Sequence, residues 1–113
     1  MKIENNLFQS GFFKTKPNYN DEVIDRQIVE EIVNFLKNKG VLELPMLKGF
    51  QYSVSSYGLK HIIEKAMGKY LSMGNTIQAM IELGFDYTID AQNCYYNISV
   101  KQLKKLRTQW KIK

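Results

Sequence analysis

The sequence predicts a small α+β domain, and three observations lead to this fold class. Apolar residues recur at helical spacing in two runs within residues 55–85, and a short, glycine-marked link separates the runs. Apolar and polar residues alternate at strand spacing on both sides of a turn within residues 85–98. The chain of 113 residues is long enough for one hydrophobic core. Residues 1–113 are therefore expected to form a single domain.

An N-terminal arm is predicted for residues 1–19, which show no regular period. Phe8, Phe12 and Phe13 are too many aromatic residues for a free tail, so we expect the arm to pack across the domain. The alternative is an aromatic arm that inserts into a partner.

The first helix is predicted for residues 20–39. Asn18 or Asn20 can cap it, and Gly40 suits the position after its end. Its apolar stripe consists of Ile24, Ile28, Ile32 and Phe35.

Residues 55–85 predict a helix-turn-helix-like pair. The first helix has Ser55 or Ser56 as its cap and Gly68 after its last apolar residue. The second has Ser72 as its cap and Gly84 at its end. The apolar faces are expected to meet in one core through Ile62, Ile63, Ile77 and Ile81. Because the link is short, the two helices must be neighbours that cross at an angle.

A β-hairpin is predicted for residues 85–98, with its turn at residues 90–93. A further short strand at residues 50–54 could lie beside this hairpin. Two helices followed by a hairpin favour a winged-helix-like arrangement. A basic C-terminal helix is predicted for residues 99–113, capped by Ser99 and anchored by Leu103, Leu106 and Trp110.

Positive charge gathers in the second half of the chain. The net charge is +5, and no acid follows Asp90. Such a cluster suits phosphate or an acidic protein face, and the alternative is a solvated helix surface. The predicted basic surface comprises Lys60, Lys65, Lys69, Lys101, Lys104, Lys105, Arg107 and Lys111.

The second helix of the pair offers a candidate DNA-reading face. In a helix-turn-helix this helix enters the major groove, and Asn or Gln can read adenine through two hydrogen bonds. The helix has no Lys or Arg of its own, which is unusual for a groove reader. The candidate recognition residues are Asn75, Thr76, Gln78 and Glu82.

No catalytic or metal site is predicted. His61 is the only histidine and Cys94 the only cysteine, so a tetrahedral zinc site of imidazole and thiolate ligands is excluded. The chain has no nucleophile elbow, phosphate loop or dinucleotide fingerprint. We therefore expect a protein that is not an enzyme and needs no cofactor.

The composition favours a cytoplasmic location. A single cysteine fits a reducing compartment, and no apolar run approaches the ~20 residues that span a bilayer. Glu4 and the lack of a continuous apolar segment near the start argue against a secretory signal. No membrane partner is expected.

Residues 55–99 resemble a pattern found in small proteins of phages, plasmids and other mobile elements. The pattern runs SYGLKH, E, Y-x-S-N-G-x-F-I-x-A, G-F and N-x-x-F-N-I-S. The matching residues are Ser56 to His61, Glu64, Tyr70, Ser72, Ile77, Ala79, Gly84, Phe85, Asn93, Tyr96, Asn97, Ile98 and Ser99. Met73-Gly74 stands where the pattern has Asn-Gly, and Thr76 where it has an aromatic residue.

The resemblance implies a bacterial host cell and a shared fold, and it carries over no functional residues. Two functions follow from this habitat and from the charge. The first is a non-enzymatic protein that binds a host protein or ribonucleoprotein complex, such as an inhibitor of a host defence complex of the anti-CRISPR kind. The alternative is a winged-helix-like DNA-binding regulator or accessory protein, with nucleic acid as its partner.

Overall fold

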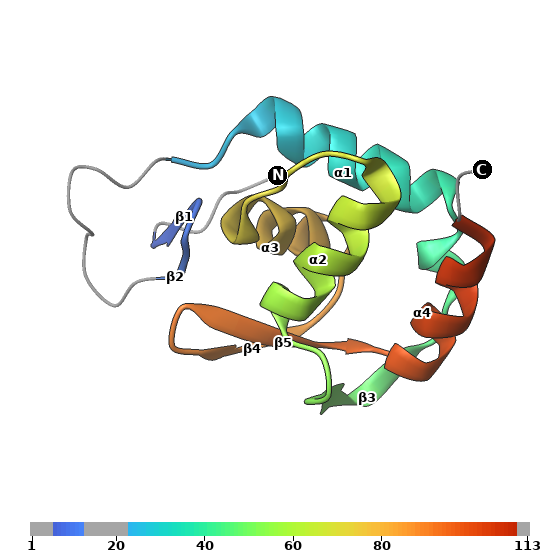
Figure 1. Cartoon of the computed structure of the whole chain (residues 1–113). Helices are drawn as coiled ribbons and strands as arrows, with labels where there is room; N and C mark the ends of the chain where they lie inside the picture. The colour runs from blue at the N-terminus through green and yellow to red at the C-terminus, as the bar shows by residue number, and fades with distance from the viewer. Residues whose placement is uncertain (1–5, 13–22, 111–113) are drawn as a thin grey trace.

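A three-stranded antiparallel sheet forms one layer of the structure, and helices cover one of its faces (Figure 1). The computed structural model describes residues 6–12 and 23–110. The sheet has the order β3-β5-β4, with β3 at Met46–Gln51, β4 at Tyr87–Asp90 and β5 at Asn93–Ile98. The predicted hairpin is thus confirmed. The predicted extra strand lies beside it, at residues 46–51 rather than 50–54.

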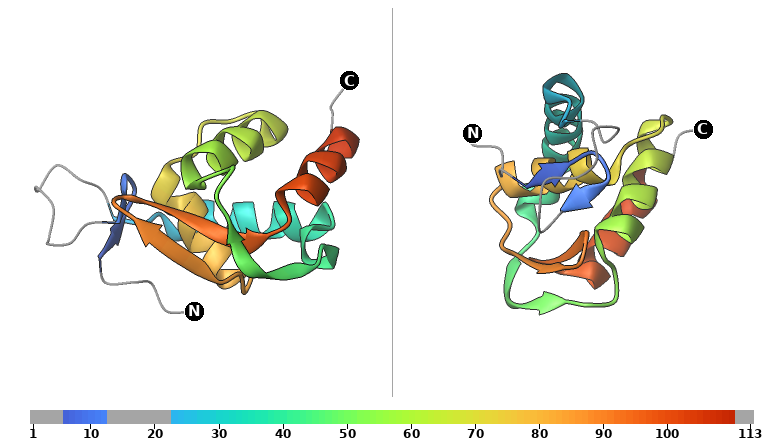
Figure 2. Two further views of the ribbon diagram at one scale, coloured as in Figure 1. Left: turned by 90° about the horizontal axis from the view of Figure 1, so that it is seen from below. Right: turned by 90° about the vertical axis from the view of Figure 1, so that its left-hand side faces the viewer.

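Four α-helices lie in the described part of the chain, so the predicted α+β class is confirmed. They are α1 (Arg26–Asn38), α2 (Ser56–Met67), α3 (Met73–Glu82) and α4 (Val100–Arg107). Short 3-10 helices follow α1 at Val41–Glu43 and α4 at Thr108–Trp110. Figure 2 shows α2 and α4 on the same side of the molecule, with α1 behind them.

The first helix begins later than the sequence predicts. Its cap is Asp25, whose Oδ1 accepts hydrogen bonds from the N–H groups of Gln27 (3.1 Å) and Ile28 (3.3 Å). Val23 forms an antiparallel bridge with Phe8, so the chain is still extended just before the cap. The predicted caps Asn18 and Asn20 lie outside the described residues, as does Phe13 of the arm.

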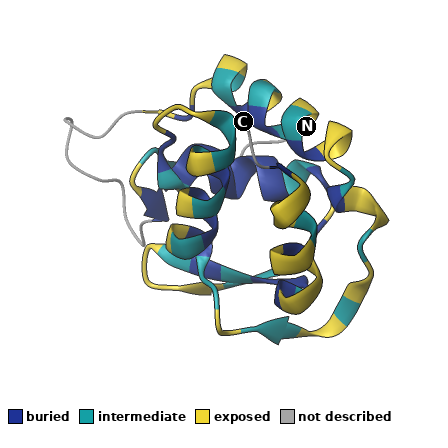
Figure 3. Ribbon diagram, turned by 45° about the vertical axis from the view of Figure 1, so that its right-hand side comes forward, coloured by how far each residue is buried: buried dark blue, intermediate teal, exposed yellow. Residues whose placement is uncertain are grey.

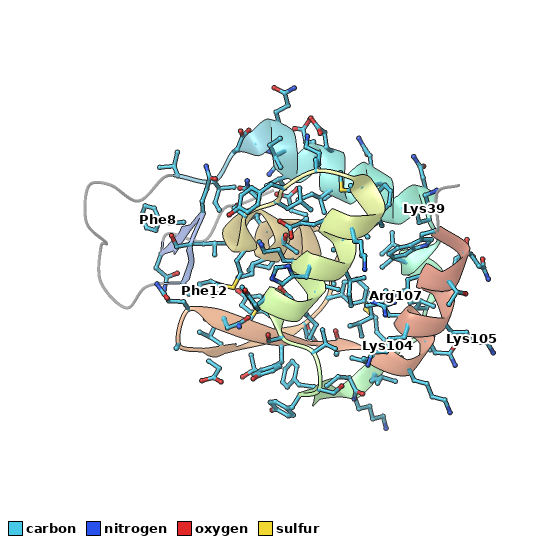
Figure 4. The ribbon with its side chains drawn as sticks, in the orientation of Figure 1. Phe8, Phe12, Lys39, Lys104, Lys105 and Arg107 are labelled. Atoms are coloured by element: carbon cyan, nitrogen blue, oxygen red, sulfur yellow. The ribbon has the colours of Figure 1, made fainter. Side chains whose placement is uncertain are left out.

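The N-terminal arm folds into a second small sheet, with β1 at Leu7–Phe8 and β2 at Gly11–Phe12. Phe12 is buried and its ring stacks on that of Tyr87 with 5.9 Å between centroids. Figure 4 shows Phe12 on the side of the β1–β2 hairpin that faces β4. The expectation that the arm packs across the domain is confirmed for these residues.

Both helices of the pair form where they are predicted, but the Ser55 side chain at the start of α2 accepts no capping hydrogen bond. Ser72 caps α3 by accepting a hydrogen bond from the Asn75 N–H (3.2 Å), and Gly68 ends α2 in the left-handed conformation. Ile63 and Ile77 are fully buried in the shared core, while Ile62 and Ile81 are half-buried at its edge. α3 also packs along α1, which makes it the central helix of the domain. Figure 3 shows exposed residues on the other helices, on the sheet and on the connecting loops.

Candidate functional site

The candidate recognition helix does not offer a polar face to solvent. Asn75, Thr76 and Gln78 are buried, and the Glu82 side chain is only 6% exposed. The predicted groove-reading face is therefore wrong as an exposed surface. The polar side chains instead connect α3 to its surroundings inside the domain.

Each of these polar side chains has an internal partner. Asn75 Oδ1 accepts a hydrogen bond from the Asp25 N–H (3.0 Å), and Thr76 Oγ1 donates to the Ser72 carbonyl (3.0 Å). Gln78 Nε2 donates to Glu82 Oε2 (2.9 Å). The Arg26 guanidinium binds both carboxylate oxygens of Glu82.

The lysines predicted on the helix pair divide into three cases. Lys60 is only 6% exposed, so its assignment to the basic surface is wrong. Lys65 is exposed on α2, as expected. Lys69 is half-exposed, and its Nζ pairs with Glu31 Oε1 of α1 at 2.8 Å.

The remaining predicted cations gather on α4. Lys101, Lys104, Lys105 and Arg107 are all exposed, and none forms an ion pair within the described part of the chain. We call these four residues the α4 face. Lys111 lies outside the described residues. Figure 4 shows Lys104, Lys105 and Arg107 at one end of the molecule, with Lys39 of α1 at the same end.

The opposite side of α4 is fixed to the core. Leu103 and Trp110 are buried, and the Trp110 ring meets the Phe35 ring edge-on with 5.8 Å between centroids. Trp110 Nε1 donates to the Lys39 carbonyl (3.4 Å). Three cations in the last turn also suit the negative end of the helix dipole. The α4 face is therefore a positive surface that the fold holds in place.

A second cluster lies around α2 and was not predicted from the sequence. Lys60 Nζ is 3.1 Å from Glu64 Oε2, and it lies over the rings of Tyr70 (4.9 Å to the centroid) and Tyr57 (5.6 Å). The Tyr57 ring meets the His61 ring edge-on with 4.5 Å between centroids. The sequence signal that could have indicated this surface is the spacing of Tyr57, His61 and Lys65, which lie at successive turns of one helix.

Glu64 holds this cluster together. Its carboxylate contacts Lys60, His61 Nδ1 (3.2 Å) and the N–H of Leu71 (2.8 Å). Desolvation alone would raise the Glu64 pKa, but the hydrogen bonds from Leu71 and Lys60 outweigh it, and the pKa is lowered. The carboxylate is thus an anion in the folded protein, and it ties the α2–α3 link to α2.

A buried polar trio joins α2 to the sheet. Ser56 Oγ lies 2.7 Å from Tyr96 Oη and 3.0 Å from Cys94 Sγ, and all three residues are buried. Burial raises the pKa of the Cys94 thiol and that of the Tyr96 phenol, so both stay neutral near pH 7. A buried neutral thiol is a poor nucleophile, so the contacts of the trio favour a structural role that joins α2 to β5.

Tyr96→Phe tests this structural role. The variant removes one hydroxyl and leaves Ser56 with fewer partners, so we expect the free energy of unfolding to fall by about 1–2 kcal/mol. Urea unfolding monitored by circular dichroism would measure this loss. Tyr95→Phe, on the neighbouring half-buried position, is the control and should have almost no effect. Equal stability of both variants and the wild type would contradict the proposed hydrogen bonding.

Two further facts concern the described residues alone. Among residues 6–12 and 23–110, no three His, Cys, Asp or Glu side chains gather as a metal-binding group. None of the helices in these ranges is long and apolar enough to cross a membrane.

The chain as a whole shows significant similarity to no protein-family model, no curated protein and no solved structure.

Proposed function

We propose that this is a non-enzymatic binding protein that docks through the α4 face onto an acidic surface of a host protein complex. The single observation that supports this most strongly is the α4 face itself: four exposed cations, without an ion pair to any described residue, on a helix that has no acids. Because Leu103 and Trp110 fix the helix, little backbone entropy is lost when these charges meet a partner.

The resemblance to mobile-element proteins supports the kind of partner. It favours a protein or ribonucleoprotein complex in the cytoplasm of a bacterial host, with inhibition of a defence complex, of the anti-CRISPR kind, as the proposed outcome. The burial of Asn75, Thr76 and Gln78 supports the same choice, since α3 has no exposed polar face with which to read a major groove.

The test is to change Lys101, Lys104, Lys105 and Arg107 together to Gln. Affinity capture from lysate of a bacterial host, with identification by mass spectrometry, would supply the partner for kinetic measurements. At low salt we expect the association rate to fall about tenfold, with little change in dissociation, because exposed charges mainly steer encounter. The difference should shrink as salt is raised.

A control uses exposed lysines outside both the α4 face and α2, namely Lys37 and Lys48, also changed to Gln. This variant should retain most of the association rate. Wild-type kinetics for the α4 variant would show that the α4 face is only a solvated surface. An equal loss of association rate in both variants would show that any positive charge suffices.

The second candidate function is DNA binding by a winged-helix-like domain. The order of elements α1-β3-α2-α3-β4-β5 and the sheet order β3-β5-β4 support this alternative. Contacts to duplex would then come from the β4–β5 hairpin and the α4 face, not from α3. Duplex binding whose log–log salt slope falls by about 0.9 for each α4 cation removed would favour this function over protein binding.

A further inference from the structure

The outer side of α2 and the link that follows it carry three exposed rings. Tyr57 is 56% exposed and Tyr70 is 77% exposed, and about half of the His61 side chain is exposed. Tyr57 and His61 lie one helical turn apart, and Lys65 lies one turn further on. We call Tyr57, His61, Lys65 and Tyr70 the aromatic strip.

One buried ammonium group orients the two tyrosines. Lys60 Nζ lies over both rings, at 5.6 Å from the Tyr57 centroid and 4.9 Å from the Tyr70 centroid. Lys60 itself is almost fully buried and tied to Glu64. The cation therefore lies close to both rings, and the Tyr57 ring also contacts His61, yet more than half of each tyrosine is exposed to solvent. Attraction between the ammonium and the rings holds the two tyrosines near each other although they come from different segments.

One lysine of the aromatic strip, Lys65, is left to meet an anionic ligand. Lys65 is exposed and forms no ion pair within the described residues, whereas Lys69, next to Tyr70 in the sequence, is paired with Glu31 of α1. Glu64 is mostly buried and its charge is met by Lys60. Asn93 Oδ1 accepts a hydrogen bond from the Tyr57 N–H (3.2 Å), and Asp90 is the strand partner of Asn93 in the β4–β5 ladder. Asp90 therefore lies near the Tyr57 end of the aromatic strip. The positive end of the strip is thus the end with Lys65 and Tyr70.

From this arrangement we propose that the aromatic strip binds single-stranded nucleic acid, with unpaired bases stacked on Tyr57 and Tyr70 and a phosphate at Lys65. Exposed aromatic rings combined with lysines form the stacking surface that such ligands use. Paired bases in a duplex do not present their faces to side chains. An acidic peptide would gain from Lys65 but not from the ring faces.

This inference does not rest on the proposed role of the α4 face. The two surfaces come from different helices, and their tests use different substitutions. A protein partner at α4 and a nucleic-acid strand on α2 would together suit a ribonucleoprotein target, but either site can be absent without affecting the other.

The experiment measures fluorescence anisotropy with labelled oligo(dT) and oligo(U), with a mixed-sequence duplex and labelled poly-L-glutamate as competing classes. Tyr57→Ala and Tyr70→Ala should each weaken single-strand binding about tenfold, because each removes one stacked base. Tyr57→Phe and Tyr70→Phe keep the ring and should bind within about twofold of the wild type. Lys65→Gln should lower the salt slope by about 0.7.

The control is Tyr52→Ala, since Tyr52 is equally exposed but pairs with Tyr95 away from the strip, with 4.9 Å between ring centroids. It should bind like the wild type, and thermal melting should show that all variants are folded. In a protein whose α4 face has been changed to Gln, Tyr57→Ala and Tyr70→Ala should still weaken single-strand binding about tenfold. Preference for duplex or poly-L-glutamate, absence of single-strand binding, or equal binding by the Ala variants would overturn the proposal.

Discussion

Replacing Arg26 with methionine is expected to lower the free energy of unfolding by about 2–3 kcal/mol at neutral pH. Arg26 binds both carboxylate oxygens of Glu82, whose side chain is almost fully buried. Without the guanidinium, a buried carboxylate remains with Gln78 as its one hydrogen-bond partner within the described residues. Losing one member of a fully buried pair costs about 3–5 kcal/mol, and the 40% exposure of the Arg26 side chain reduces that figure.

The loss should depend on pH in a definite direction. The hydrogen bond from Arg26 is the largest cause that lowers the Glu82 pKa below its ordinary value, and it outweighs desolvation. A lowered folded-state pKa stabilises the protein above the unfolded-state pKa, and this contribution is lost as the pH falls through the folded-state pKa. The wild type should thus lose stability from about pH 5 downward, and the gap to Arg26→Met should narrow there.

Urea unfolding of both proteins between neutral and acidic pH measures this effect. Arg107→Met is the matched control, because it removes the same charge from an exposed site without an ion pair within the described residues. It should change stability by less than about 0.5 kcal/mol. If Arg26→Met behaved like this control, or if its deficit did not shrink in acid, the pair would contribute no stability.

This pair also shows why the sequence misled about α3. Asn75, Gln78 and Glu82 lie on the side away from the apolar stripe, and a polar side of a helix is normally exposed. Asp25 and Arg26, about fifty residues earlier in the chain, are the partners of Asn75 and Glu82, and Gln78 in turn donates to Glu82. Helical periodicity reports which residues differ in polarity, but it carries no information about a distant segment that supplies hydrogen bonds.

Signals within a few residues of each other were more dependable. Ser72, Gly68 and Ser99 act at the helix ends where the sequence placed them, because a cap needs only its own next turn. The start of α1 was misplaced because the bridge between Phe8 and Val23 joins segments that are distant in the sequence.

The same contrast between local signals and contacts from distant segments applies to the candidate surfaces. The α4 face was predicted because its cations and its apolar anchors alternate within one short helix. The aromatic strip was missed because tyrosine is found both inside and on the surface of proteins, so composition cannot tell which rings are exposed. The mistaken exposure of Lys60 has the same origin, since Tyr57, Glu64 and Tyr70 enclose it only in the folded chain.

Gly74→Ala is expected to destabilise the protein by about 2–3 kcal/mol, although alanine normally favours a helix by about 1 kcal/mol over glycine. Gly74 lies in the first turn of α3, directly beneath the N-terminal hairpin. A Cβ atom there would lie 1.7 Å from the Phe8 carbonyl oxygen and 2.8 Å from the Gln9 Cα. Both are backbone atoms, so no side-chain rotation relieves the overlap and the β1–β2 hairpin must move.

Moving the hairpin breaks further contacts. The Gly74 N–H donates to the Gln9 carbonyl at 2.8 Å, and the Phe12 N–H donates to the Gln92 carbonyl at 3.0 Å. Phe12 would also leave its stacked position on Tyr87 and expose apolar surface to water. The hairpin is therefore expected to detach as a unit, while the α1–α3 core and the three-stranded sheet stay folded.

Hydrogen exchange followed by mass spectrometry would locate this change, and urea unfolding would give its size. In Gly74→Ala, the Phe12 amide and the segment around it should lose protection, whereas the amides of α1 and β5 should exchange as in the wild type. Gly58→Ala is the matched control: it makes the same substitution in a helix, where the new Cβ meets only the Val54 Cγ1 at 3.2 Å, an atom of a side chain that can shift. Gly58→Ala should leave protection of the hairpin unchanged. A Gly74→Ala variant as stable and as protected as the wild type would mean that the hairpin does not rest on α3, and the burial of the α3 N-terminus would have to be explained without it.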